Sequence, residues 1–180
     1  MKGIIFTNFI ALVEEKFGIE IAEGIISESS LASEGAYTNV GTYHHQEIFQ
    51  LANRLSEKTG LTREQLFAVF GEHVFKLFVA GYPQFFLGVK SSFDFLMNIE
   101  GYIHVEVRKL YPDAELPTFN TSLLSPTKLE MIYKSERKMA DFAHGLIKGC
   151  LQHFQQNGTI AVEKLTEQGD KVRFVVEIVD

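Results

Sequence analysis

A chain of 180 residues is long enough to form one domain, or two small lobes that share a core, and to enclose a buried cofactor. Hydrophobic residues make up 46% of it, and sixteen phenylalanines with no tryptophan argue against a disordered or fibrous chain. The 23 acidic and 17 basic residues give a net charge of −6, with no basic stripe, so we do not expect a nucleic acid partner. We expect a single domain over residues 1–180.

The N-terminal segment has some features of a signal peptide, because Lys2 precedes an apolar stretch from Ile4 to Val13. The stretch ends at Glu14 without a small-residue cleavage site, and it is about half as long as a membrane-spanning helix. We therefore predict an amphipathic helix and no membrane association. The lone Cys150 excludes an internal disulfide and a thiolate cluster, and it fits a reducing cytoplasm.

Helical spacing dominates the chain as far as Pro112. Thr62 and Gln65 form a capping box at the start of one predicted helix, and Pro83 follows the end of that helix. The predicted helices lie at about 2–17, 45–58, 62–80 and 92–111.

Shorter segments follow Pro112. We predict two strands joined through Ser125-Pro126, then a helix from about 137 to 156 and a hairpin that turns at 168–170. In the last strand, alternate residues from Val172 to Ile178 are apolar, which predicts one buried and one wet face. The predicted strands are 119–124, 128–133, 159–166 and 171–179. The fold class is therefore α+β, with helices first and an antiparallel sheet last.

One histidine stands among apolar residues on the helix predicted at 92–111. A buried neutral imidazole can coordinate iron through one ring nitrogen while the other donates a hydrogen bond. A lone histidine on an apolar face is nevertheless more often an ordinary core residue, and Gly101 is either tolerated or leaves room for a flat ligand. At helical spacing the predicted face holds Phe93, Met97, Gly101, His104, Val107 and Tyr111.

A second group of polar residues lies where the second strand ends. If the chain is extended there, Tyr133, Ser135 and Arg137 face the same way and present two hydroxyls and a guanidinium to one point. Such donors suit carboxylates, because Arg offers a planar fork of charged N–H groups. A strand end followed by an ordinary helix start remains the alternative.

These residues together resemble a known family. The sequence HVEVRKLYPDAELPTF, beginning at His104, followed about thirty residues later by Y-x-S-x-R, is similar to the haem nitric oxide/oxygen-binding (H-NOX) domain. That domain is related to the haem module of soluble guanylate cyclase. The resemblance covers the whole chain. His104, Pro117 and the triad of Tyr133, Ser135 and Arg137 agree with the family in order and spacing.

The resemblance implies a b-type haem (iron protoporphyrin IX) between a helical distal lobe and a proximal lobe that contains the sheet. The family's axial iron ligand corresponds to His104, and its propionate clamp corresponds to Tyr133, Ser135 and Arg137. The proline that presses on the porphyrin and distorts it corresponds to Pro117.

The distal pocket also follows from the resemblance. Oxygen-binding members of the family have a tyrosine where this chain has Phe142, and Val74 takes a position that supports that tyrosine. Bound dioxygen gains from a distal hydrogen-bond donor, whereas nitric oxide and carbon monoxide bind ferrous haem without one. We therefore expect a sensor of nitric oxide that also binds carbon monoxide and excludes oxygen. By this resemblance the pocket is lined by Ile5, Phe9, Val74, Phe78, Phe142 and Leu146.

The resemblance further implies an output through a conformational change. Nitric oxide weakens the iron bond to His104, whose helix then shifts while the haem flattens against Pro117. Stand-alone bacterial members of the family regulate a separate histidine kinase or diguanylate cyclase, so we expect such a partner.

Two other interpretations remain open. A haem enzyme would need a polar acid-base pair on the distal side, where the inferred residues are all hydrocarbon, so we expect no enzymatic activity. A haem-free interaction or small-molecule domain of the same fold is the other alternative, and His104 together with the triad argues against it. His44, His45 and His153 have no assigned role and are expected to be exposed or capping, whereas Cys150 is expected to be buried.

Overall fold

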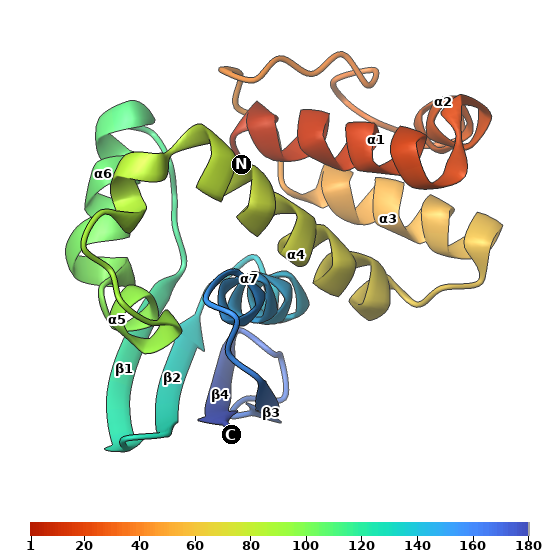
Figure 1. Cartoon of the computed structure of the whole chain (residues 1–180). Helices are drawn as coiled ribbons and strands as arrows, with labels where there is room; N and C mark the ends of the chain where they lie inside the picture. The colour runs from red at the N-terminus through yellow and green to blue at the C-terminus, as the bar shows by residue number, and fades with distance from the viewer. Residues whose placement is uncertain (180) are drawn as a thin grey trace. The chain divides into compact units, whose positions relative to one another are not determined.

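The computed structural model describes residues 1–179 (Figure 1). Its internal contacts divide the chain into two compact units, Met1–Phe70 and Gly71–Asp180. The division falls inside one helix, α4 (Arg63–Gly81), and the change from helical spacing to shorter segments at Pro112 lies within the second unit. That residues 1–180 act as a single domain stays a prediction.

The first unit consists of helices, and the helices predicted there are confirmed to within one or two residues. It holds α1 (Gly3–Phe17), α2 (Ile19–Ser27), α3 (Gln46–Thr59) and the start of α4. The short α2 was not predicted. It follows α1 directly, because the positive φ of 90° at Gly18 lets the chain turn from one helix into the next.

Amphipathic spacing and capping explain the helices of this unit. In α1, Phe6, Phe9 and Val13 recur at three- and four-residue intervals and are buried. The predicted capping box is confirmed: the Thr62 N–H donates to Gln65 Oε1 over 2.9 Å, and the Gln65 N–H donates to Thr62 Oγ1 over 3.2 Å.

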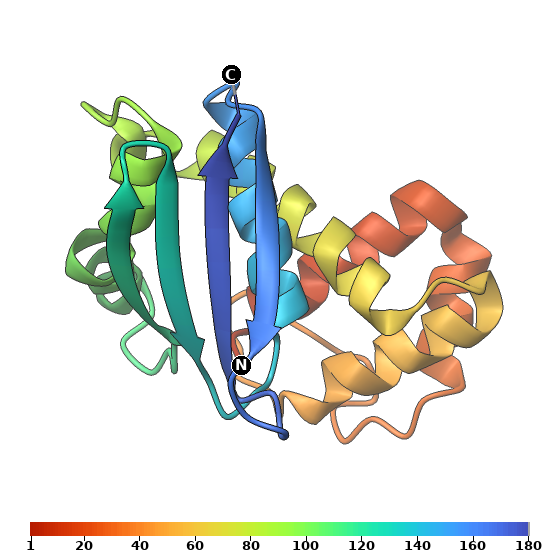
Figure 2. The same ribbon diagram turned by 90° about the horizontal axis from the view of Figure 1, so that it is seen from below.

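The second unit contains a sheet that confirms the α+β class. Among residues 1–179, four strands pair antiparallel in the order β1-β2-β4-β3 (Figure 2). The strands are β1 (Thr118–Ser125), β2 (Lys128–Lys134), β3 (Gly158–Lys164) and β4 (Lys171–Ile178).

The two faces of the sheet differ as the sequence predicts. Val172, Phe174 and Val176 of β4 are buried, and they share a core with residues of the helix α7 (Ala140–His153), including the fully buried Cys150. On the other face, Arg173 bridges the neighbouring strands through ion pairs to Glu130 and Glu163. The centre of one face, along β2 and β4, is therefore buried, whereas the other face carries ion pairs.

The prediction of a single helix at 92–111 is wrong, because the chain there forms three short helical pieces. These are α5 (Ser92–Met97), the π-helical turn η2 (Ile99–Ile103) and α6 (His104–Leu110). In the π turn the Ile103 N–H donates to the Asn98 carbonyl, five residues earlier, over 3.2 Å. The wider turn rotates the following residues relative to an unbroken α-helix, so Met97 and Gly101 lie on the exposed side rather than on one face with His104.

The segment before α5 forms the 3₁₀ helix η1 (Pro83–Phe86), which was not predicted. Across residues 1–179, none of the helices combines the length and the apolar character that crossing a membrane would require.

Candidate functional site

His104 is held in place by a carboxylate on the preceding turn. The side chain of His104 is buried, and its Nδ1 lies 2.9 Å from Glu100 Oε1. Burial lowers the pKa of His104 below its ordinary value, while the nearby Glu100 charge acts in the opposite direction. The imidazole is therefore favoured in its neutral form, with Nδ1–H donating to Glu100 and Nε2 available to coordinate a metal.

Glu100 connects this turn to the sheet as well. Its Oε1 also accepts a hydrogen bond from the backbone N–H of Phe119, the second residue of β1, over 2.9 Å. The rings of His104 and Phe119 lie near one another, with centroids 6.1 Å apart. Glu100 was not predicted, although its spacing of four residues from His104 on a helical segment is a signal that could have identified it.

The structure brings Tyr133, Ser135 and Arg137 together. Tyr133 is buried at the end of β2, and its hydroxyl accepts a hydrogen bond from the Met139 N–H over 3.0 Å. Burial raises the pKa of Tyr133, and the interactions with Ser135, Met139 and Arg137 lower it in part. The Ser135 hydroxyl also accepts from the Arg137 N–H over 3.2 Å. Tyr133, Ser135 and the Arg137 backbone thus form one polar cluster at the end of β2, and the Arg137 charge acts on Tyr133 from nearby.

The guanidinium of Arg137 already binds a carboxylate in the structure. Its Nη2 donates to Glu115 Oε2 and its Nη1 to the Glu115 backbone carbonyl, both over 2.7 Å. Glu115 is mostly exposed, whereas the side chain of Arg137 is only 17% exposed. Glu115 lies 22 residues away in the loop before Pro117 and β1, where no spacing rule connects it to Arg137 in sequence. Pro117 itself is half-buried, two residues before Phe119.

The residues expected on the distal side belong to both units. In the first unit, Ile5 is half-buried and Phe9 is buried against Phe70, with ring centroids 5.2 Å apart. In the second unit the expected residues lie on α4 and α7 and are each half-buried. They are Val74, Phe78, Phe142 and Leu146.

Close packing of α4 against α7 explains how the second-unit residues are positioned. A Cβ added to Gly71 would lie 2.3 Å from the Phe142 carbonyl oxygen and 2.8 Å from the Leu146 nitrogen. A Cβ on Gly149 would similarly lie 2.8 Å from the Phe75 Cβ. The absence of side chains at these two glycines lets the helix backbones approach closely.

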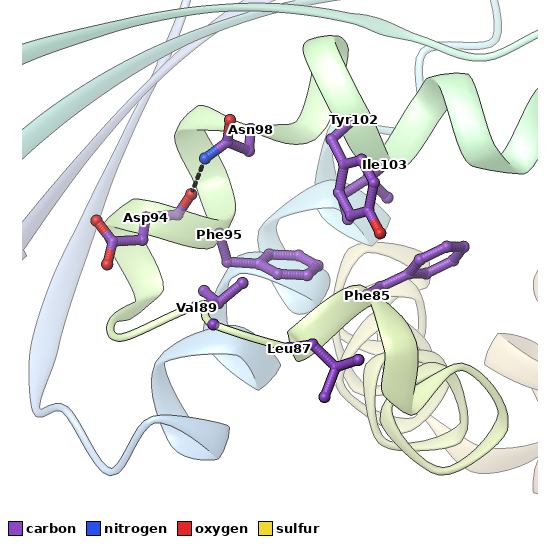
Figure 3. Close-up of a pocket in the computed structure, with 9 residues that line it drawn as sticks. Phe85, Leu87, Val89, Asp94, Phe95, Asn98, Tyr102 and Ile103 are labelled. Carbon is purple, nitrogen blue, oxygen red and sulfur yellow. Dashed lines mark hydrogen bonds between the residues drawn. The ribbon is translucent and has the colours of Figure 1, made fainter.

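A pocket of about 460 Å³ lies beside the His104 segment within the second unit (Figure 3). Phe85 of η1 and Phe95 of α5 line it, together with Ile103, which directly precedes His104. At its rim the Asn98 side-chain amide donates to the Asp94 carbonyl over 2.8 Å. None of the predicted site residues lines this pocket. The pocket was not predicted, because no periodic pattern in the sequence indicates it.

Comparisons with known proteins identify the family. The family model described as haem-NO-binding matches residues 2–162. The chain belongs to the haem-NO-binding, or H-NOX, family. A search of curated proteins gave no match.

Solved H-NOX structures agree with this assignment. The Fe(II) unliganded H-NOX protein from K. algicida is 44% identical, with a TM-score of 0.95 over 100% of this chain and 97% of that one. The H-NOX from Shewanella woodyi, solved in the Fe(II)CO state, is 38% identical, with a TM-score of 0.84 over 99% and 95% of the two chains. The S. oneidensis protein, solved in the Fe(II)NO state, is 25% identical, with a TM-score of 0.91 over the full length of both chains.

The side chains of this H-NOX chain fit the family's cofactor, haem. His104 presents a buried imidazole whose Nδ1 is already engaged, which is the arrangement that metal-ligating histidines adopt. Arg137 binds the carboxylate of Glu115, so the polar cluster is able to hold a carboxylate such as a haem propionate. Haem needs a ligand for its iron and hydrogen-bond donors for its propionate carboxylates, and residues of both kinds are present in the second unit.

Proposed function

We propose that this chain is a haem-based sensor of nitric oxide. The observation that carries the proposal is the buried His104, held through Nδ1 by Glu100 with Nε2 left as the donor to iron. In the proposal Tyr133, Ser135 and Arg137 hold the propionates and Pro117 presses on the porphyrin. The haem is of the b type, because the lone Cys150 is buried and leaves the chain without a pair of cysteines for covalent attachment.

The residues of this chain would each have a defined task. Bound haem would supply a ferrous iron that can bind a diatomic gas. His104 would donate an electron pair to that iron, and Arg137 would exchange its exposed partner Glu115 for a propionate. The side chains proposed for the distal side are all hydrocarbon, so each of them offers no hydrogen-bond donor. They are Ile5, Phe9, Val74, Phe78, Phe142 and Leu146.

We further propose that the chain binds nitric oxide and carbon monoxide but excludes oxygen. Dioxygen on iron carries partial negative charge and needs a distal donor, which a phenylalanine at position 142 does not supply. The relatives solved in the Fe(II)NO and Fe(II)CO states support the choice of gases.

The proposed output is a change of protein surface rather than a chemical product, so the chain is not an enzyme in this account. When His104 is released, the short pieces η2 and α6 would shift relative to the sheet. We propose a histidine kinase or a diguanylate cyclase as the partner that responds, and the cytoplasm as the place of action.

Absorption spectra of the purified, reduced protein test the proposal. We expect a Soret band that is the same in air and under nitrogen, and that changes on addition of nitric oxide or carbon monoxide. Protein purified with an adequate haem supply that shows no Soret band would favour the haem-free alternative. A stable spectrum of an oxygen complex in air would contradict oxygen exclusion.

The variant Phe142→Tyr tests the role of position 142 directly. A phenol placed there supplies the missing donor, so we expect a measurable oxygen complex and slower autoxidation than in the parent protein. Phe17→Tyr, on the exposed end of α1, is the matched control and should leave the spectra unchanged. If the two variants had the same spectra in oxygen, the residue at position 142 would not control oxygen binding.

A further inference from the structure

One carboxylate oxygen connects the proposed iron ligand to the sheet. Glu100 Oε1 lies 2.9 Å from His104 Nδ1 and 2.9 Å from the Phe119 backbone nitrogen. One of these donors belongs to the π turn and helix that carry His104, and the other belongs to β1, two residues after Pro117. The side chain of Glu100 is about one-third exposed, whereas that of His104 is 10% exposed, so the contact with the imidazole is mostly shielded from water.

The local backbone explains why Glu100 reaches both donors. Glu100 lies in the π turn Ile99–Ile103, four residues before His104. In this widened turn the backbone N–H groups of Tyr102 and Ile103 both donate to the Asn98 carbonyl. Of the three charged residues on α6, Glu106 pairs with Lys109 over 2.6 Å, and Arg108 is a cation whose charge lowers the pKa of His104. Glu100 is therefore the carboxylate placed to act on the imidazole.

A carboxylate that accepts from the Nδ1–H of a ligating histidine makes the imidazole a better electron donor and fixes the orientation of its ring. A hydrogen bond to a charged acceptor is roughly twice as strong as one between neutral groups. Both effects would favour coordination of a bound iron by Nε2, and the second bond of Glu100 connects its turn to the start of β1.

We propose that Glu100 is a positioning residue that sets how readily His104 leaves the iron. Its carboxylate strengthens the donation from His104, and its bond to the Phe119 N–H ties any displacement of the His104 turn to the start of β1. This inference rests on the proposed function, because it needs haem ligated through His104.

Two variants separate the charge of Glu100 from its hydrogen bonds. Glu100→Gln keeps an acceptor for both donors and removes the charge, whereas Glu100→Ala removes the acceptor as well. Glu106→Gln removes a carboxylate of the same segment that pairs with Lys109, and it serves as the matched control. The probes are resonance Raman spectroscopy of the reduced holoprotein and stopped-flow absorption after mixing with nitric oxide.

We expect the iron–histidine stretching frequency to fall in Glu100→Gln and to fall further in Glu100→Ala, with no change in Glu106→Gln. The rate at which His104 dissociates from the iron after nitric oxide binds should rise about tenfold in Glu100→Ala. This is the lower end of the effects seen when a residue that hydrogen-bonds to a metal ligand is replaced. A smaller rise is expected in Glu100→Gln. A merely structural role would alter thermal stability without this graded shift in frequency.

The outcomes distinguish the two proposals. If the parent protein shows the iron–histidine band and both Glu100 variants match it and Glu106→Gln in frequency and rate, the role of Glu100 is overturned while haem sensing stands. If the parent protein purified with haem shows no such band, the proposed function fails and the role of Glu100 with it.

Discussion

Two parts of the second unit carry the proposed haem contacts, and they differ in regularity. The strands β2 and β4 are paired along their whole length, and their buried residues alternate without interruption. The segment from Ser92 to Leu110 is instead broken into two short α-helices and a π turn. Tyr133 extends from the regular part, whereas His104 begins the last piece of the irregular one.

The difference bears on how each residue works. A residue on a paired strand is fixed by the core beneath it, which suits Tyr133 as a permanent anchor for a carboxylate group. A π turn replaces the regular hydrogen-bond ladder with fewer and wider bonds, and such turns are frequent at functional sites. His104 therefore sits on an element that is suited to change position while the sheet stays in place.

The largest effect is expected in the core beneath the sheet. Phe174→Ala removes a fully buried ring from β4 and should lower the free energy of unfolding by about 3–5 kcal/mol. Val162→Ala, at the exposed position that pairs with Phe174 in β3, should change it by less than about 0.5 kcal/mol. Urea unfolding followed by circular dichroism measures both, and similar losses in the two would show that the sheet is not the rigid part.

A smaller loss is expected at the end of β2. Tyr133→Phe leaves the Met139 N–H buried without its acceptor, which should cost about 1–3 kcal/mol. We also expect faster transfer of haem to an acceptor protein, because the cluster with Ser135 and Arg137 loses a member. If the free energy of unfolding and the rate of haem transfer were both unchanged, Tyr133 would have no role in holding the propionates.

The irregular segment should tolerate substitution in its exposed π turn. No atom lies within 4 Å of the position that a Cβ at Gly101 would take, and the φ of Gly101 is outside the left-handed region. Gly101→Ala should therefore stabilise the protein by about 0.4–1 kcal/mol, measured by urea unfolding of the haem-free protein. Haem retention should not change, whereas loss of haem would support the view that a flat ligand approaches the Gly101 backbone.

The smallest effect is expected for the partner of Arg137. Glu115 is 85% exposed, so Glu115→Ala should change the free energy of unfolding by less than about 1 kcal/mol. Glu136→Ala, another exposed carboxylate of the same unit, is the control. A loss well above that of the control would mean that the Glu115–Arg137 pair is structural rather than a replaceable partner.

Periodic patterns made most of the fold predictable. The alternation of β4 and the capping box of Thr62 and Gln65 each have a local cause, and the structure confirms both. The break after Met97 was not predictable, because the apolar spacing from Phe93 to Tyr111 fits an unbroken α-helix equally well. The short α2 was missed because it lies directly after α1 with only Gly18 between them.

The candidate site was predictable to a different extent. The resemblance named His104, Tyr133, Ser135 and Arg137, and the last three lie together in the structure. Their partners could not be read in the same way: Glu100 acts through a π turn that the pattern did not reveal, and Glu115 reaches Arg137 across a loop. Contacts made by tertiary structure leave little trace in sequence spacing.

The central claim is that His104 ligates the iron of a haem, and His104→Gly tests it most directly. The account predicts that this variant purifies without colour and that added imidazole restores the Soret band by filling the vacated position. A variant that keeps its haem and an unchanged spectrum without imidazole would contradict the claim.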